Sequence, residues 1–419
     1  MAASKMKLEL TRVLHGGSRL GVLKGLGKTG QHSLEVPGCL LYTHCGTVPH
    51  LTRETLHSLD ELPSVTQVTL SDLAEHQEVL ADFKEGFKKF SGLYDTVLYC
   101  SLHDPATPCP TGYTTNKTVS VWGSGGRIEL TVAKFMALQR HVQPDWYLSM
   151  ADGETWQDNT SRKRVRKAVD RTLAHLDECL RVQQTLQELR GAEVWGAVQG
   201  GDILEERLRS ARETAKRPVA GFCLDGLQTG RMDPALRSQI VTAVIKELPE
   251  DKPRLLQGVG RPDEVLACAE AGVDLFEGFF PFQVTERGCA LCFSFETRTD
   301  PESTVLDEEL AGDPQQNGDH NTTDDPTQMT SFEMDLKDKR YRDDFGPLVE
   351  GCGCYCCQNH QRAYLHHLLV TNELLAGVLL TIHNMAHYLG FFAALRGALA
   401  RNELDLLKRR VLASTGTKA

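Results

Sequence analysis

The stretch from residue 146 to residue 281 contains five short apolar runs: WYLSMA (146–151), EVWGAVQG (193–200), VAGFCLDGL (219–227), PRLLQGV (253–259) and DLFEGFFP (274–281). Between them, the spacing predicts amphipathic helices over residues 162–189, 203–216, 234–248 and 262–271. In the first helix, apolar residues recur every three or four positions, on one stripe that faces a sheet: Val165, Val169, Leu173, Leu176 and Leu180. Strands joined by helices run parallel, so the pattern predicts repeated β–α units.

A closed barrel is the fold class that we expect from this repetition. A further run, TVLYCSL (96–102), predicts a barrel strand upstream, whereas the residues before about 95 are mixed in character. This many β–α units favour a (β/α)8 TIM barrel over an open sheet, although their count alone also fits a doubly wound α/β fold. The 419 residues are enough for one such barrel with appendages.

Composition argues against several protein classes. Hydrophobic residues make up 41% of the chain and charged residues 24%, which are globular averages. Residues 5–9 carry three charges, and the first ten residues include no apolar core of signal-peptide length, so secretion is not expected. The thirteen cysteines are therefore expected to be reduced thiols. The apolar stretch 374–395 contains His383, Asn384 and His387, which favours a buried helix and no transmembrane segment.

Four cysteines crowd into GCGCYCCQ (351–358), and two histidines follow on an apolar helical pattern. The candidate ligands are Cys352, Cys354, Cys356, Cys357, His383 and His387. Thiolates this close would repel one another unless a cation neutralised them, and zinc favours tetrahedral sulfur and nitrogen ligation. A site closed by three sulfurs and a histidine predicts one structural zinc ion without a catalytic role. Spacing leaves open whether Cys356 or His387 is a ligand, and a disulfide or ordinary core cysteines are the alternatives.

An acidic segment over residues 299–334 divides the chain. It has ten Asp and Glu residues, no Lys or Arg, and many Pro, Gly, Asn and Thr residues, so a disordered insertion is predicted. A partner-binding acidic segment is the alternative. Outside it, 46 acidic residues balance 46 basic ones, so the net charge of −10 belongs to the insertion. We therefore expect a barrel with an N-terminal elaboration (1–298), the insertion (299–334), and a zinc-binding loop with C-terminal helices (335–412).

Several stretches occur in an order and spacing that point to one family. They are WGSGGR (122–127), SMADGE (149–154), GAVQGG (196–201), GFCLDGL (221–227), LLQGVGRP (255–262), GVDLFEGFFP (272–281) and DLKDKRYRDDFGPL (335–348). With the cysteine loop and TIHN (381–384), these stretches resemble the tRNA-guanine transglycosylase family, the queuine tRNA-ribosyltransferases. The resemblance covers most of the chain. It implies a barrel and one structural zinc ion, with this ligand set: Cys352, Cys354, Cys357 and His383.

Two positions depart from the chemistry that the resemblance implies. The family displaces a base from ribose C1′ by attack of an aspartate carboxylate. The matching residue is Glu277, whose extra methylene would move the carboxylate by about one C–C bond, a shift that costs orders of magnitude in rate. The second catalytic carboxylate is replaced by Gly123, which can neither accept nor donate a proton. Both departures predict that the chain alone is not an enzyme, with Glu277 as an altered nucleophile as the alternative.

Part of a base pocket is also implied. Asp152, Gln199 and the backbone of Gly226 and Leu227 match positions that hydrogen-bond the base in the family. An aspartate is suited to a purine-like Watson–Crick edge, because its carboxylate accepts two hydrogen bonds side by side. These residues predict a vestigial queuine-binding site. Ordinary polarity at a barrel mouth, or helix capping, explains them equally well.

Contacts with tRNA phosphates are a further implication. The basic residues that follow the family's nucleophile correspond to Gln283 and Glu286, and Arg287 one residue later could partly compensate. The run SRKRVRKAVDR (161–171) places basic side chains at the start of a helix: Arg162, Lys163, Arg164, Arg166, Lys167 and Arg171. They predict either a phosphate contact or a solvated helix face.

The resemblance therefore implies a non-catalytic subunit of queuine tRNA-ribosyltransferase. It would form a heterodimer with the catalytic subunit, which exchanges guanine for queuine at wobble position 34 of tRNAs for Asp, Asn, His and Tyr. The tRNA would be contacted through the complex, and a homodimer is the alternative assembly of the chain alone. The helices over residues 362–412 are the expected partner surface.

Two other functions are alternatives. A self-sufficient tRNA ribosyltransferase would use Glu277 as its nucleophile. A metal-dependent barrel hydrolase would need histidine and carboxylate ligands at strand ends, and the predicted strands offer no such histidine set. The expected location is the cytoplasm, with a peripheral position on the mitochondrial outer membrane as the alternative.

Overall fold

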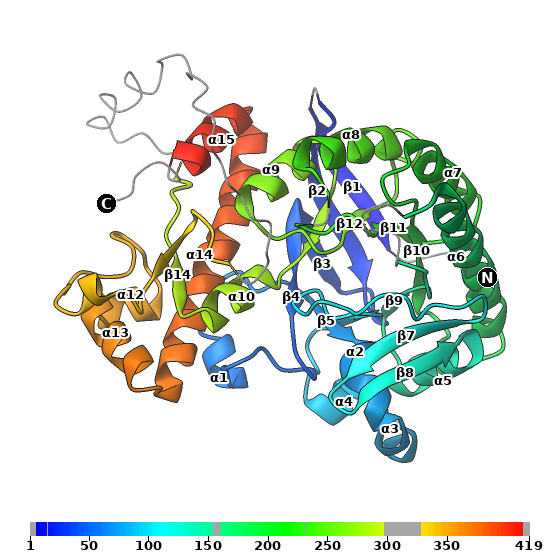
Figure 1. The fold of residues 1–419 in the computed structure, drawn as a ribbon, viewed down its shortest axis with the longest axis horizontal. Helices are drawn as coiled ribbons and strands as arrows, with labels where there is room; N and C mark the ends of the chain where they lie inside the picture. Colours follow the sequence, from blue (N-terminus) through cyan, green and yellow to red (C-terminus); the bar gives the residue numbers. More distant parts are fainter. Residues whose placement is uncertain (1–5, 15, 154–159, 231, 297–327, 414–419) are drawn as a thin grey trace.

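Eight parallel strands form a closed barrel at the centre of the chain (Figure 1). The computed structural model describes residues 6–14, 16–153, 160–230, 232–296 and 328–413. In barrel order the strands are β4 (Gly38–Tyr42), β5 (Val65–Thr69), β6 (Val97–Ser101), β9 (Trp146–Leu148), β10 (Glu193–Val198), β11 (Gly221–Leu224), β12 (Arg254–Leu256) and β13 (Leu275–Glu277). Strand β13 pairs with β4 and closes the ring. The predicted TIM barrel is confirmed, and the doubly wound alternative is excluded.

Helices surround this barrel. They are α1 (Arg53–Leu56), α2 (Leu70–Leu73), the 3-10 helix η1 (Ala74–His76), α3 (Gln77–Phe83), α4 (Phe87–Ser91), α5 (Val132–Val142), α6 (Arg162–Gln183), α7 (Leu204–Ala215), α8 (Pro234–Ile245), α9 (Pro262–Glu270) and α10 (Phe280–Glu286). The predicted helices are α6 to α9, and each starts within one residue of its expected position. Capping explains this accuracy for two of the four helices, because the Ser161 and Asp233 side chains accept backbone N–H groups of α6 and α8.

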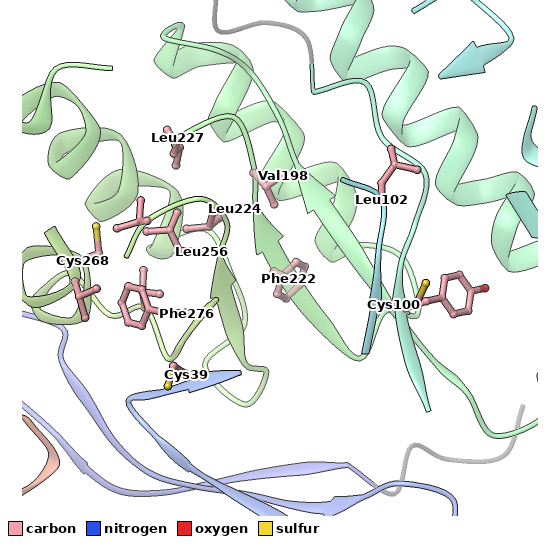
Figure 2. Packing of buried hydrophobic residues seen from close by; sticks show 14 of the residues in the cluster. Cys39, Cys100, Leu102, Val198, Phe222, Leu224, Leu227, Leu256, Cys268 and Phe276 are labelled. Atoms are coloured by element: carbon pink, nitrogen blue, oxygen red, sulfur yellow. The ribbon is translucent and has the colours of Figure 1, made fainter. Parts of the chain in front are cut away.

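The two-residue period of the strands sorts their side chains between two buried layers. In β11, Phe222 and Leu224 pack against the surrounding helices, whereas Cys223 between them faces the barrel interior. Figure 2 shows members of the outer layer, among them Val198 and Phe276. The inner layer contains Tyr99, Trp146, Trp195, Leu255 and Leu275. A residue two positions beyond an inner-layer residue therefore points into the barrel mouth, the end at which the parallel strands finish.

An antiparallel sheet closes the opposite end of the barrel. Its strands are β1 (Lys7–Val13), β2 (Arg19–Leu26) and β3 (His32–Val36), and its apolar residues join the inner layer. Arg19 donates two hydrogen bonds of 2.8 Å to the carboxylate of Asp274, which directly precedes β13. Both side chains are buried, so the pair ties the sheet to the barrel. A second hairpin, β7 (Thr118–Gly123) with β8 (Gly126–Thr131), packs against α2.

A smaller lobe follows the barrel. It contains β14 (Cys289–Leu291), β15 (Glu333–Asp335), the 3-10 helix η2 (Lys339–Tyr341), α12 (Tyr355–Asn359), α13 (Arg362–Val370), α14 (Leu374–Arg401) and α15 (Leu404–Ala413). Helix α14 runs between the barrel and the helices α12 and α13 (Figure 1). It is long and apolar enough to cross a membrane, yet 72% of its most apolar window is buried inside the chain. This supports its interpretation as a buried helix.

The predicted insertion is described only in part. Residues 299–327 lie outside the described part of the chain. Phe332 is buried, and Glu333 and Met334 belong to β15, which pairs with β14. Glu333 also accepts a bidentate pair from Arg287 at 3.0 and 2.8 Å. The last residues that were assigned to the insertion therefore belong to the folded lobe.

Candidate metal centre and barrel mouth

Three thiols and one imidazole nitrogen meet where the cysteine loop packs on α14. The metal cluster consists of Cys352, Cys354, Cys357 and His383. The three Sγ atoms lie 3.9, 3.5 and 3.4 Å from Nδ1 of His383, and all four ligand atoms lie within 4.8 Å of one another. A tetrahedral site with metal–sulfur bonds of about 2.3 Å and metal–nitrogen bonds of about 2.0 Å separates sulfur from nitrogen by roughly 3.5 Å. The cluster could therefore hold one metal ion.

Local structure orients these donors. Cys354 is the N-cap of α12, and its sulfur accepts the backbone N–H of Cys357 at 3.4 Å. The Nε2–H of His383 donates to the Leu291 carbonyl of β14 at 2.8 Å. This bond places the remaining lone pair on Nδ1, which faces the thiols, as is usual for metal-bound histidines. The site thus joins the loop, α14 and β14.

The structure also decides between the ligands that spacing left open. Cys356 points into the apolar core of the lobe, and burial raises the pKa of its thiol to about 12. His387 donates to the Phe293 carbonyl at 2.9 Å and lies edge-on to the rings of Phe293 and Phe295. Burial lowers the pKa of His387 to about 3, so it is a neutral core residue. Neither residue belongs to the metal cluster.

At the barrel mouth, Glu277 is held by three donors. Its Oε1 accepts Nε2 of Gln67 at 2.6 Å and of Gln257 at 3.4 Å, and its Oε2 accepts the backbone N–H of Gly258 at 2.8 Å. The side chain has no exposed surface. Burial raises the pKa of Glu277 to about 7, and the hydrogen bonds oppose that shift. Gln67 also donates to Ser101 at 3.0 Å, so β5, β6, β12 and β13 meet at this carboxylate.

Gly123 leaves space that another carboxylate fills. A Cβ atom added at Gly123 would lie 2.1 Å from Oε1 of Glu75. Glu75 accepts the backbone N–H of Gly125 at 2.5 Å and the hydroxyl of Ser124 at 2.8 Å. The Glu75 side chain therefore braces the turn of the β7–β8 hairpin. A larger residue at position 123 would displace it.

Asp152 is enclosed by two arginines of α6. Nη1 and Nη2 of Arg164 donate to its two oxygens at 2.8 and 2.7 Å, and Nη1 of Arg171 adds a bond of 3.0 Å. Arg171 also donates to Asn116, with bonds of 3.1 and 2.5 Å. Asp152 itself is fully buried. These two arginines were assigned to a possible surface patch, and the structure shows that they point inward instead.

The other predicted pocket positions are bonded within the chain. Gln199 donates to Asp225, whose other carboxylate oxygen accepts the Gly226 N–H at 2.6 Å. Four carbonyls around them accept hydrogen bonds from the buried guanidinium of Arg207, at 2.5 to 3.0 Å. They belong to Val198, Gly201, Asp225 and Gly226. Leu227 is buried in the outer layer (Figure 2), so only its backbone is polar.

The residues after Glu277 are also committed to contacts within the chain. Gln283 donates to the Ala106 carbonyl at 3.2 Å, and Glu286 pairs with His50 at 2.8 Å. Arg287 binds the buried Glu333, so it points into the lobe. On α6, Lys163, Arg166 and Lys167 are exposed and form no ion pair with any residue that the structure describes.

Sequence reasoning missed the partners that hold these residues. Gln67 lies on a strand from the region that was hard to place, and its two-residue register with Val65 would have pointed it into the mouth. Asp225 is part of GFCLDGL, beside the residues that were chosen. Arg207 gave no signal, because an arginine in an amphipathic helix is usually exposed.

Comparison with known proteins adds independent findings. The family model described as "Queuine tRNA-ribosyltransferase" matches residues 15–417. A Danio rerio protein named "Queuine tRNA-ribosyltransferase accessory subunit 2" is 67% identical over 413 residues, covering 97% of this chain and 99% of its own length. The Homo sapiens protein of that name is 56% identical over 419 residues, with the same coverage, and the Ixodes scapularis one is 37% identical over 403 residues, covering 93% and 96%. The chain therefore belongs to the queuine tRNA-ribosyltransferase family.

Proposed function

We propose that this chain is the non-catalytic subunit of a queuine tRNA-ribosyltransferase. It pairs with a catalytic subunit that exchanges guanine for queuine at position 34 of tRNAs for Asp, Asn, His and Tyr. The bonding of Glu277 carries the proposal, because both its oxygens accept hydrogen bonds and its side chain is fully buried. A carboxylate attacks a sugar carbon only when one of its oxygens is accessible to the substrate and aligned with that carbon. The names of the Danio rerio and Homo sapiens relatives support an accessory role.

A second observation supports the missing chemistry. The position expected to supply the other carboxylate is Gly123, and the neighbouring Glu75 is bonded to the hairpin turn. General acid–base catalysis needs a group within hydrogen-bond reach of the proton that it moves. Residue 123 has no carboxylate, and the neighbouring Glu75 carboxylate is bonded to the turn of the hairpin. Of the two acids that the reaction needs, Glu277 is thus bonded within the chain, and the other is absent.

The metal that we propose is a single structural zinc ion held by the metal cluster. Three sulfurs and one nitrogen are the donor set that zinc prefers, and they fill its four positions. The ion would fix the cysteine loop to α14 and β14, and thereby stiffen the lobe. Metal analysis of the purified chain should give one zinc per chain. A stoichiometry near zero in the folded chain would contradict the assignment.

The partner surface that we propose lies where α13 turns into α14. Of the apolar residues expected in the C-terminal helices, Phe391, Phe392 and Leu395 are buried in the chain. Leu374 is 87% exposed, and Val370 is 61% exposed. Exposed apolar side chains that lie together are typical of protein interfaces. Leu374→Glu should weaken assembly with the catalytic subunit, or of a homodimer when the chain is alone, whereas Val13→Glu at the far end of the barrel should not.

A base-exchange assay tests the function directly. Incorporation of labelled queuine into tRNA is measured with the chain alone, the catalytic subunit alone, and both together. We expect no exchange by the chain alone, exchange by the mixture, and an unchanged rate when the mixture contains Glu277→Gln. Exchange by the purified chain that Glu277→Gln abolishes would instead establish a self-sufficient ribosyltransferase. Fractionation of tagged chain would test the proposed cytoplasmic location against the mitochondrial outer membrane.

A further inference from the structure

Arg164 occupies the side of Asp152 that a ligand would need. Two parallel N–H groups of its guanidinium donate to the two carboxylate oxygens at 2.8 and 2.7 Å. A purine that carries N–H groups on adjacent ring and exocyclic nitrogens would offer the same pair of parallel donors. One edge of a carboxylate accepts one such pair at a time. The arginine and the base are therefore alternatives.

The surroundings of Asp152 match a polar ligand better than a simple ion pair. A Cβ atom at the next residue, Gly153, would lie 3.0 Å from Oδ2 of Asp225 and 3.6 Å from Nε2 of Gln199. Asp152 thus adjoins the Gln199–Asp225 pair. Oε1 of Gln199 is fully buried and has no hydrogen-bond partner among the described residues. Buried polar atoms without partners are uncommon in native proteins, and a bound polar molecule would satisfy them.

The two arginines hold Asp152 in different ways. They are seven residues apart on α6, two turns along one face, so both reach the same carboxylate. Arg171 is 15% exposed and is fixed at its other edge by Asn116. Arg164 is 26% exposed and lies in the first turn of α6, behind the N-cap Ser161. Arg171 can keep Asp152 ionised and oriented while Arg164 withdraws, because a carboxylate accepts about four hydrogen bonds.

We infer that Arg164 is a built-in occupant of the base pocket, which competes with a purine base for the carboxylate of Asp152. The contact closes the pocket in the isolated chain. This inference rests on the proposed function, because it treats the mouth as a former base site. Its test needs neither the catalytic subunit nor tRNA, so its failure would leave the subunit role standing.

Binding of tritiated guanine to the isolated chain, measured by equilibrium dialysis, tests the inference. The Arg164→Ala chain should bind guanine at least tenfold more tightly than the unchanged chain, which corresponds to about 1.4 kcal/mol. The double variant Arg164→Ala with Asp152→Asn should lose that gain. Arg162→Ala is the matched control, because Arg162 lies on the same helix but pairs with Glu205. Equal binding by the unchanged chain and Arg164→Ala would overturn the inference, as would a gain that survives in the double variant.

Two further measurements distinguish competition between Arg164 and guanine for Asp152 from a general loss of order at the site. Hypoxanthine lacks the exocyclic amino group, so it should displace guanine from Arg164→Ala at least tenfold less effectively than unlabelled guanine does. Added methylguanidinium should compete with guanine, because it restores the missing donors. Arg164→Lys keeps the charge without the paired donors, and it replaces the alanine variant if that variant fails to fold. Its affinity for guanine should lie between that of the unchanged chain and that expected for Arg164→Ala. Hypoxanthine that displaces guanine as well as unlabelled guanine does, or methylguanidinium that fails to compete, would contradict the inference.

Discussion

The metal centre and the barrel mouth differ in what their polar side chains are bonded to. In the metal cluster, four donor atoms face one another, and the hydrogen bond from Nε2 of His383 to the Leu291 carbonyl orients the imidazole. At the mouth, Glu277, Asp152 and Gln199 are each bonded to donors or acceptors of the chain itself. One site is thus arranged to receive an ion, whereas the carboxylates of the other are bonded within the chain.

This difference separates a site that is open to a ligand from a site whose side chains support the fold. A metal ion held by the four donors would tie the cysteine loop and α12 to α14. At the mouth, the carboxylate oxygens of Glu277 and Asp152 accept hydrogen bonds from other parts of the chain. These bonds connect the βα loops to one another. The chain therefore has the barrel of its family, and the carboxylates at the mouth of this barrel are bonded within the chain. Each of the following experiments changes one side of this contrast.

Loss of a metal ligand should have the largest effect. Cys357→Ser removes one sulfur, and binding of a structural zinc ion contributes on the order of 10 kcal/mol to folding. We expect the lobe to lose most of its stability and the chain to lose its metal, measured by urea unfolding and metal analysis. Cys356→Ser is the matched control, because this neighbour packs in the core outside the cluster. It should keep one metal ion and cost about 1–2 kcal/mol. An unchanged metal content in Cys357→Ser would contradict the role of Cys357 as a metal ligand.

At the mouth, the largest expected effect is that of Arg207. Burial lowers the pKa of its guanidinium to about 10, so it remains charged at neutral pH. Arg207→Met would leave four carbonyls without their donor, which should cost about 3–5 kcal/mol of unfolding free energy. Arg212→Met on the same helix removes an exposed pair with Glu247 and should cost less than about 1 kcal/mol. Equal costs would show that the loops at the mouth do not depend on Arg207.

Glu277 should make stability depend on pH. Its pKa rises from 4.5 to about 7 on folding, so the folded chain binds the proton more tightly. The stability that this provides is complete below pH 4.5 and is lost as the pH rises through about 7, by about 3 kcal/mol. Glu277→Gln cannot titrate, so the unfolding free energy of the unchanged chain minus that of Glu277→Gln should fall as the pH rises from 5 to 8. A constant difference would mean that the carboxylate is ionised throughout.

The sequence predicted the repeating part of the fold and the metal cluster well, for a physical reason. Helix α6 has an apolar stripe, and α6 and α8 have side-chain N-caps, which are local signals. The metal cluster draws three of its ligands from six neighbouring residues. The region before residue 95 was harder, because it mixes the antiparallel sheet that closes the barrel with two barrel strands. Its strands are defined by distant pairings, such as β4 with β13.

The mouth could be located from the sequence, but its bonding could not. The motifs identified Asp152 and Glu277 as pocket positions, yet Gln67 lies 210 residues before Glu277. Arg164 and Arg171 read as part of a basic run, and only the direction of α6 shows that they turn inward. Which polar groups satisfy one another depends on three-dimensional contacts between loops, which periodicity does not encode.

The smallest expected effect concerns the outward face of the same helix. Lys163, Arg166 and Lys167 are exposed at the mouth end of α6, so replacing all three with Glu should weaken tRNA binding by the heterodimer severalfold and flatten its salt dependence. The control makes the same charge change at the far end of the barrel, at Arg181, Lys216 and Lys246, where helices α6, α7 and α8 finish. A loss confined to the first variant would give the mouth a positioning role without chemistry. Equal losses would reflect net charge alone. Unchanged affinity in both variants would mean that this face of α6 contacts only solvent.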